Sequence, residues 1–179
     1  MNTIETVKPT MSDIENLDYK YQPELTKKLD NIDSDFDQGL INEIVLWKTN
    51  RYSWIDDKTI KLINQIKKDD KEINLDLTKE ILKNLLDKSQ KGFRLAMVST
   101  ILRFKNPNIY QIIDQRVYRF LYNEELKISG QNVSKMIGVY LAYLEKLKDE
   151  SNIHQIDFKK ADRVFYSVDK KYNKDLKIN

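Results

Sequence analysis

The chain contains no cysteine and a single histidine, His154. The absence of cysteine excludes a disulfide scaffold, a thiolate metal site, an iron–sulfur cluster and a cysteine nucleophile. One histidine is too few for a metal centre built from several imidazoles. We therefore expect no bound metal and no other cofactor.

Glycine and proline are also scarce: 4 and 3 among 179 residues leave little material for tight hairpin turns. No apolar run approaches the ~20 residues that cross a membrane. The N-terminus lacks the basic and apolar segments of a signal peptide. We expect a cytoplasmic location and no contact with a membrane, and nothing in the sequence implies a protein partner.

Apolar residues recur with the period of an α-helix along nearly the whole chain. The stripes predict helices over residues 40–48, 60–66, 77–86, 95–102, 133–147 and 158–172. A further short helix is expected after Asp114. These patterns predict an all-α fold, a single compact helical domain of about seven to nine helices. It is expected to cover residues 21–179, after a loose N-terminal arm at residues 1–20.

Several polar residues are expected to begin or end these helices. Asp76, Asp114 and Asp157 each precede an apolar stripe, which is the position of an N-cap. Asn106 and Pro107 interrupt the stripe that precedes them and therefore end that helix.

The net charge of +3 is unevenly distributed. Residues 1–40 carry 4 basic and 9 acidic side chains, whereas residues 88–127 carry 8 basic and 3 acidic ones. The second segment would attract a polyanion, and the first would not. The alternative is that the basic side chains form ordinary solvated surface.

Three segments combine residues that suit a chemical role, and the first surrounds Gly92. A glycine at a helix start lets another backbone approach closely, and the N–H groups of the first turn bind anions such as phosphate. Three cations lie beside it, Lys88, Lys91 and Arg94. The alternative is that Gly92 only closes a tight turn between two helices.

The second segment leads through Ile112 and Ile113 into Asp114. As an N-cap, Asp114 would contribute about 1 kcal/mol, and that role needs no further explanation. In a functional role, the carboxylate would stabilise a cationic transition state or orient a water molecule. Both interpretations are open from the sequence.

The third segment covers residues 47–54, where three aromatic and two basic side chains fall within eight residues. This composition suits stacking on a base next to a phosphate. Alternatively, both tryptophans anchor the core and the cations extend to solvent. The candidate residues are Trp47, Lys48, Arg51, Tyr52 and Trp54.

Together, the first two segments resemble the helix-hairpin-helix DNA glycosylase superfamily. In that family a helix, a glycine-containing hairpin, a second helix and a short connection lead to an aspartate that begins the next helix. Here the stretch runs from Leu85 through Lys91-Gly92-Phe93-Arg94 to Ile112-Ile113-Asp114, and with the next helix it covers about 40 residues. The family's turn is usually Leu-Pro-Gly-hydrophobic-Gly. This chain has Lys88-Ser89-Gln90-Lys91-Gly92 and keeps only the last glycine.

The resemblance implies a base-excision activity, a hydrolase acting on the N-glycosidic bond. The hairpin amides near Gln90 to Gly92, with Lys88, Lys91 and Arg94 around them, would hold a phosphate of double-stranded DNA. The target nucleotide would be flipped out of the stack. Asp114 would then stabilise the oxocarbenium character of the sugar and position the attacking water.

Bifunctional members of the family carry a nucleophilic lysine at the position of Arg94. A guanidinium cannot form a Schiff base, so the resemblance implies a monofunctional enzyme, with Lys91 the nearest substitute. A broader likeness links Trp47-Lys48, Arg94-Leu95-Ala96-Met97 and Ala161-Asp162-Arg163 to small bacterial members. Some of these act in phage defence by excising heavily modified bases.

On this likeness, the 47–54 side chains would line the base pocket or fill the gap left by the flipped base. Asp162 and Arg163 are expected to pin the last helix through an internal ion pair. Two other functions remain open: a non-catalytic DNA-binding helix-hairpin-helix module, and a purely structural helical protein in which Asp114 is only a cap. The sequence does not identify the base or distinguish DNA from RNA.

Overall fold

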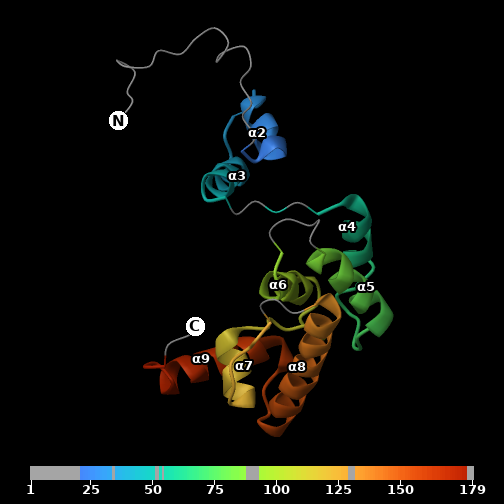
Figure 1. Cartoon of the computed structure of the whole chain (residues 1–179), viewed down its shortest axis with the longest axis vertical. Coiled ribbons are helices and arrows are strands. Elements are labelled where there is room, and N and C mark those ends of the chain that lie inside the picture. Colours follow the sequence, from blue (N-terminus) through green and yellow to red (C-terminus); the bar gives the residue numbers. More distant parts are fainter. Residues whose placement is uncertain are drawn as a thin grey trace. The chain divides into compact units, whose positions relative to one another are not determined.

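The computed structural model describes residues 21–33, 35–50, 53, 55–87, 93–128 and 132–176. In these ranges all regular secondary structure is helical, with eight α-helices and one short 3₁₀ helix (Figure 1). The predicted all-α class and the predicted number of helices are confirmed. None of the described helices is long and apolar enough to cross a membrane. The expected arm at residues 1–20 lies outside the described ranges.

The chain divides into two compact units, Met1–Tyr52 and Ser53–Asn179. The domain expected over residues 21–179 therefore spans both units. In the first unit, α2 (Pro23–Asp30) packs against α3 (Gln38–Lys48). Among the described residues of this unit, Leu25 is the one buried hydrophobic side chain.

No apolar stripe predicted α2, which begins at a proline. Proline suits the first helical position because its missing N–H has no helical partner there and its φ angle is already helical. Two lysines in the last turn, Lys27 and Lys28, complement the negative end of the helix dipole. Pro23 and these lysines were the available signals for this helix.

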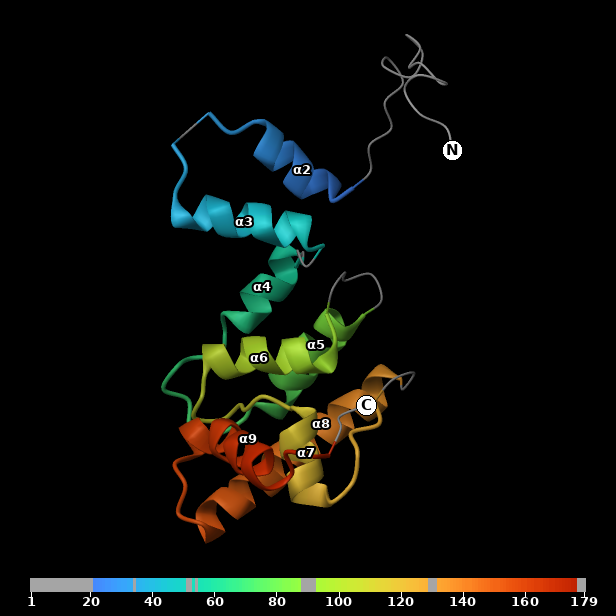
Figure 2. The same cartoon turned by 90° about the vertical axis from the view of Figure 1, so that its left-hand side faces the viewer.

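The second unit holds the main hydrophobic core. Its elements are α4 (Asp57–Ile63), α5 (Leu75–Leu86), α6 (Leu95–Lys105), α7 (Gln115–Tyr122), α8 (Val133–Ile153), η1 (Phe158–Lys160) and α9 (Ala161–Tyr172). Fully buried leucines from three helices meet in this core, including Leu82, Leu102 and Leu147. Figures 1 and 2 show α7, α8 and α9 together at the end of the unit remote from α4.

Helix starts agree with the sequence at two of the three predicted caps. Asp114 and Asp157 each accept a hydrogen bond from a backbone N–H two residues ahead. The expectation for Asp76 is wrong, because Asn74 caps α5 by accepting from the Leu77 N–H at 3.1 Å. Asp76 instead lies in the first turn, where its charge complements the helix dipole.

Candidate functional site

Asp114 occupies the junction between an irregular segment and α7. Its Oδ1 accepts a hydrogen bond from the Arg116 N–H at 2.7 Å, and the side chain is half-buried. The N-cap interpretation is therefore confirmed. A cap alone, however, does not account for how the residues on either side of Asp114 are held.

The segment preceding Asp114, residues 111–113, is held by hydroxyl groups of α8. Tyr140 donates to the Gln111 carbonyl at 3.0 Å, and Tyr143 donates to the Ile112 carbonyl at 2.7 Å. Burial raises the pKa of both phenols well above the ordinary value of 10.0. Both hydroxyls therefore remain protonated and able to donate at any physiological pH.

Two further helices hold the N–H groups of the same segment. Ser99 of α6 accepts from the Ile113 N–H at 3.1 Å, and Asp162 of α9 accepts from the Ile112 N–H at 3.4 Å. A buried irregular backbone needs such partners, because an unsatisfied polar group costs about as much as a lost hydrogen bond. Four side chains from three helices thus set the position from which Asp114 projects.

The helix that follows Asp114 is tied to α9 through Asp169, whose side chain is fully buried. Arg119 donates to both of its oxygens, at 2.9 and 2.8 Å, and Asn173 donates to one at 2.8 Å. Arg116 adds a longer contact of 3.4 Å. Burial alone would raise the pKa of Asp169, but the hydrogen bonds from Arg119 and Asn173 outweigh it and lower the pKa.

A cavity of about 280 Å³ opens beside Asp114, between the start of α7 and one face of α9. Tyr166 presents its ring to this cavity and is 38% exposed. The Arg116 guanidinium lies 6.0 Å from the centroid of that ring. The lining residues are Ile112, Asp114, Val117, Asp162, Arg163, Tyr166 and Ser167. The described residues thus bring a half-buried carboxylate (Asp114), an aromatic side chain (Tyr166) and an arginine (Arg163) to one opening.

Sequence reasoning missed Tyr166 and Ser167 as candidates. Together with Asp162 and Arg163 they occupy positions i, i+1, i+4 and i+5 of α9, which share one face of a helix. This spacing is visible in the sequence. Which element that face meets is decided by the packing of α7 along α9.

The sequence predicts an internal ion pair that pins the last helix at Ala161-Asp162-Arg163, and Asp162 forms one. Its partner is Arg103 of α6, whose Nε lies 4.0 Å from Asp162 Oδ2. Arg163 contributes only its backbone N–H, which donates to Asp162 Oδ1 at 2.7 Å. Adjacent helical residues point in different directions, so the partner of Asp162 comes from another helix.

Some basic side chains of residues 88–127 form ion pairs within the protein. Three of the eight basic side chains in residues 88–127 pair with carboxylates of α9: Arg103 with Asp162, and Arg116 and Arg119 with Asp169. Their charge therefore ties helices together. The expectation of a polyanion-facing surface over this segment has to depend on the remaining cations.

Arg94 is one of these remaining cations. It precedes α6, its side chain is exposed and makes no capping bond, and the first turn of α6 contains no acidic residue. This arrangement leaves the positive end of the helix dipole uncompensated by carboxylates of its own helix. Lys88, Gln90, Lys91 and Gly92 lie outside the described residues, so the phosphate-binding hairpin stays a prediction.

Residues 47–50 of the aromatic segment belong to the first unit. Trp47 packs edge-on against Tyr21 at 5.2 Å, and its indole N–H donates to Thr26 Oγ1 at 2.8 Å. These contacts agree with the interpretation of Trp47 as an anchor. Lys48 is exposed at the end of α3. Arg51, Tyr52 and Trp54 lie outside the described residues, and a base-pocket role for the segment stays a prediction.

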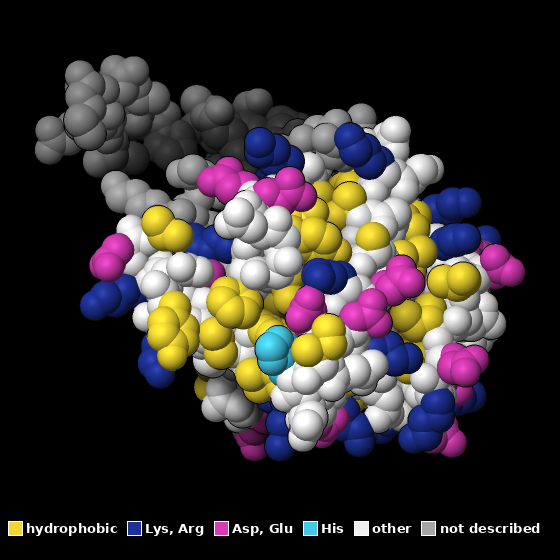
Figure 3. Space-filling view, turned by 90° about the horizontal axis from the view of Figure 1, so that it is seen from below, with side chains coloured by type: hydrophobic (Ala, Val, Ile, Leu, Met, Phe, Trp, Pro, Cys, Tyr) yellow, Lys and Arg dark blue, Asp and Glu magenta, His cyan; other side chains and the backbone are white. Residues whose placement is uncertain are grey.

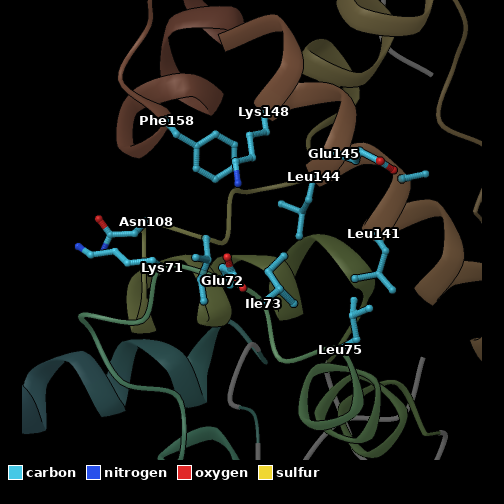
Figure 4. Close-up of a pocket in the computed structure, with 12 residues that line it drawn as sticks. Lys71, Glu72, Ile73, Leu75, Asn108, Leu141, Leu144, Glu145, Lys148 and Phe158 are labelled. Atoms are coloured by element: carbon cyan, nitrogen blue, oxygen red, sulfur yellow. The ribbon is translucent and has the colours of Figure 1, made fainter. Parts of the chain in front are cut away.

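A larger cavity of about 530 Å³ lies between α8 and the loop ahead of α5. Its floor is apolar, and charged side chains project at its rim, as Figure 4 shows for Lys148 above Glu72 and Ile73. Within the described part of the chain, the charged groups of Lys71, Glu72 and Lys148 form no hydrogen bond or ion pair. Asn108 also lines the cavity, and its side-chain amide donates to the Lys68 carbonyl and to Asn106 Oδ1.

The face seen in Figure 3 carries basic and acidic side chains next to one another, with hydrophobic side chains between them. Where carboxylates stand next to lysine and arginine, they offset the attraction of those cations for a polyanion such as DNA.

Among the described residues, no three His, Asp or Glu side chains gather closely enough to hold a metal ion. Comparisons of the chain with models of known families, with curated proteins and with solved structures found no match. The functional argument therefore depends on the geometry around Asp114.

Proposed function

We propose that the protein is a DNA glycosylase, with Asp114 as its catalytic residue. One observation carries the proposal. Four side chains from α6, α8 and α9 hold the backbone of residues 111–113, directly before Asp114, and Asp114 itself lines an open cavity. An N-cap requires only a carboxylate and a nearby N–H group. A carboxylate held this firmly at a cavity is what a reaction at a defined atom needs.

The proposed reaction is hydrolysis of an N-glycosidic bond. As the bond breaks, its electron pair leaves with the base, and positive charge develops on the sugar. Asp114 stabilises that charge and takes a proton from the water molecule that adds to the anomeric carbon. The departing base gains a proton, so the products are a free base and an abasic site.

The cavity beside Asp114 supports this proposal through its size and lining. Its volume of about 280 Å³ lies near the lower end of ligand pockets, which begin at ~300 Å³. That suits one flat ring system better than an extended substrate. Tyr166 provides a ring face of the kind on which bases stack.

Arg94 supports the choice of a monofunctional reaction. Its exposed guanidinium at the start of α6 can attract a phosphate but cannot form a Schiff base. We include in the proposal a cytoplasmic site of action and, from the likeness to small bacterial members of the superfamily, action on modified phage DNA.

The test is base release from a panel of duplexes with damaged and hypermodified bases, with products identified by mass. We expect Asp114→Asn to lower release by about 10²-fold or more, the typical cost of removing a group that stabilises transition-state charge. Asparagine caps a helix as well as aspartate does, so α7 should remain folded. The matched control is Asp37→Asn, the same change at the N-cap of α3.

Equal release by wild type and Asp114→Asn would exclude Asp114 as the catalytic residue. Binding of duplex DNA without release of any base would favour the non-catalytic module. In that case, the affinity for duplex DNA should fall as the salt concentration rises. In a plot of log affinity against log salt concentration, each lost phosphate contact should reduce the steepness of the slope by about 0.9.

A further inference from the structure

The face of α9 that lines the cavity has hydrogen-bonding groups that the proposed reaction at Asp114 does not use. Arg163 is exposed, and in the described part of the chain its guanidinium makes no hydrogen bond or ion pair. Ser167 follows one turn later on the same face, with Tyr166 beside it. These three side chains border the space where a base would sit next to Asp114.

The carboxylate of Asp162 lies on the same wall but is already engaged. Its Oδ1 accepts from the Arg163 N–H, its Oδ2 accepts from the Ile112 N–H, and Arg103 faces it. The side chain is 4% exposed. Asp162 is therefore not available to accept a hydrogen bond from an amino group on a ligand.

The α9 residues that line the cavity, Asp162, Arg163, Tyr166 and Ser167, form what we call the α9 wall. Because Asp162 is engaged, the other three side chains determine which hydrogen-bonding groups this wall offers. Arg163 offers up to five N–H donors and no acceptor, whereas the hydroxyls of Tyr166 and Ser167 can act as either. Because the Asp162 carboxylate is already engaged, the charged group on the α9 wall that is available to a ligand is the Arg163 guanidinium, which can only donate hydrogen bonds. Such a wall is complementary to carbonyl oxygens and ring nitrogens, and it opposes an amino group.

We propose that Arg163 reads the base in this cavity and selects bases with adjacent hydrogen-bond acceptors, as in the O6 and N7 atoms of a 6-oxopurine. A guanidinium binds that pair with two parallel hydrogen bonds, whereas adenine presents an amino donor at position 6. Tyr166 stacks on the ring. The proposal depends on the proposed function, because it makes the leaving base of that reaction the ligand of the α9 wall.

The same contact assists the reaction. When the glycosidic bond breaks, the electron pair that leaves with the base spreads onto its acceptor atoms. Hydrogen bonds from Arg163 to those atoms strengthen as the negative charge grows, so they favour the transition state over the bound substrate. Arg163 and Asp114 then act on opposite ends of the same bond.

The experiment measures the affinity of free hypoxanthine and of free adenine for the protein saturated with a duplex that contains a tetrahydrofuran abasic site. These two bases differ at position 6 by a carbonyl against an amino group. By calorimetry we expect hypoxanthine to bind about tenfold or more tightly than adenine, the discrimination that one bidentate pair provides. Arg163→Gln should abolish or reverse this preference, because glutamine pairs well with adenine.

Lys160→Gln is the matched control, since it removes one cation from the same end of α9 outside the cavity. Its preference for hypoxanthine should equal that of wild type. Arg163 is exposed, so Arg163→Gln should unfold at the wild-type temperature. Equal binding of the two bases, no binding of either, or a preference that Arg163→Gln leaves unchanged would each overturn the inference.

The base-affinity measurement and the Asp114→Asn assay test the two proposals separately, so either proposal can be rejected while the other stands. Base release that depends on Asp114, together with equal affinity for the two bases, would reject only the role of Arg163. A hypoxanthine preference that depends on Arg163, without base release, would reject the glycosylase and leave a base-binding cavity.

Discussion

Two cavities in the described part of the second unit differ in size and, more importantly, in how their walls are held. The larger cavity, about 530 Å³, has an apolar floor and projecting charged side chains such as Lys148 and Glu72. The smaller one, about 280 Å³, has walls tied by hydrogen bonds and ion pairs around Asp114. Volume alone would select the larger cavity as the functional site. Fixed polar groups that converge at one point favour the smaller.

Helix α8 lines the larger cavity and also supports the segment that leads to Asp114 at the smaller one. Tyr140 and Tyr143 hold the 111–113 segment, while Leu141 and Leu144 line the larger cavity. Substitutions in this region can therefore separate a change at one cavity from a general effect on the helix.

The largest effect is expected at Asp169. Asp169→Asn leaves the guanidinium of Arg119 without its buried carboxylate and should cost about 2–3 kcal/mol of unfolding free energy at pH 7. Removing one partner of a fully buried ion pair costs ~3–5 kcal/mol of stability. The cost is smaller here because Arg119 and Arg116 reach solvent, which partly screens their charges. Urea denaturation measures this loss. Asp149→Asn, an exposed carboxylate on α8, should change stability by less than about 0.5 kcal/mol.

The pH dependence provides a second check on the same variant. The pKa of Asp169 is lower in the folded protein than its ordinary value of 3.8. Its stabilising contribution is therefore complete above that value and is lost as pH falls through the lower folded pKa. The difference in stability between wild type and Asp169→Asn should accordingly narrow below about pH 4. A difference independent of pH would show that the ion pair is not its source.

An intermediate effect is expected for Tyr143→Phe. The variant keeps the ring but leaves the Ile112 carbonyl without its donor, at a cost of about 1–2 kcal/mol. Base release should also fall, because the segment before Asp114 loses a support. Tyr122→Phe removes an exposed hydroxyl contact of 3.2 Å to the Ala142 carbonyl and should change neither quantity measurably. If both variants behaved alike, the hydrogen bond to Ile112 would not position Asp114.

The smallest effect is expected at the larger cavity. Lys148→Ala removes a charged group that makes no hydrogen bond or ion pair in the described part of the chain. Stability should change by less than about 0.5 kcal/mol, and base release in the glycosylase assay should remain at the wild-type rate. A loss of base release in a folded variant would place the larger cavity within the functional site.

Local signals predicted the elements of the second unit well. Helical stripes and the cap at Asp114 depend on residues a few positions apart, so they can be identified without knowing the fold. Competition between neighbouring polar residues is harder to resolve, and Asn74 caps α5 in place of Asp76. The helix α2 has almost no core stripe, which explains why periodicity did not indicate it.

The partners of charged groups were not predictable in the same way. Arg103, Arg116 and Arg119 appear in the sequence as a basic segment, yet each pairs with a carboxylate at least 50 residues later in the chain. Asp162 is followed directly by Arg163 in the sequence, yet it pairs with Arg103. Burial decides these pairings, because a charge removed from water requires whichever opposite charge the packing brings near.

Composition and local pattern were enough to predict that the protein is helical, that it has no cysteine chemistry, and that Asp114 begins a helix. All three depend on composition or on contacts within one or two helical turns. The packing of the helices, by contrast, brings Tyr166 and Arg163 to the same cavity as Asp114 and places α6, α8 and α9 where they hold the segment before it. Those contacts join residues far apart in the chain, and they exist because hydrophobic burial packs the helices together.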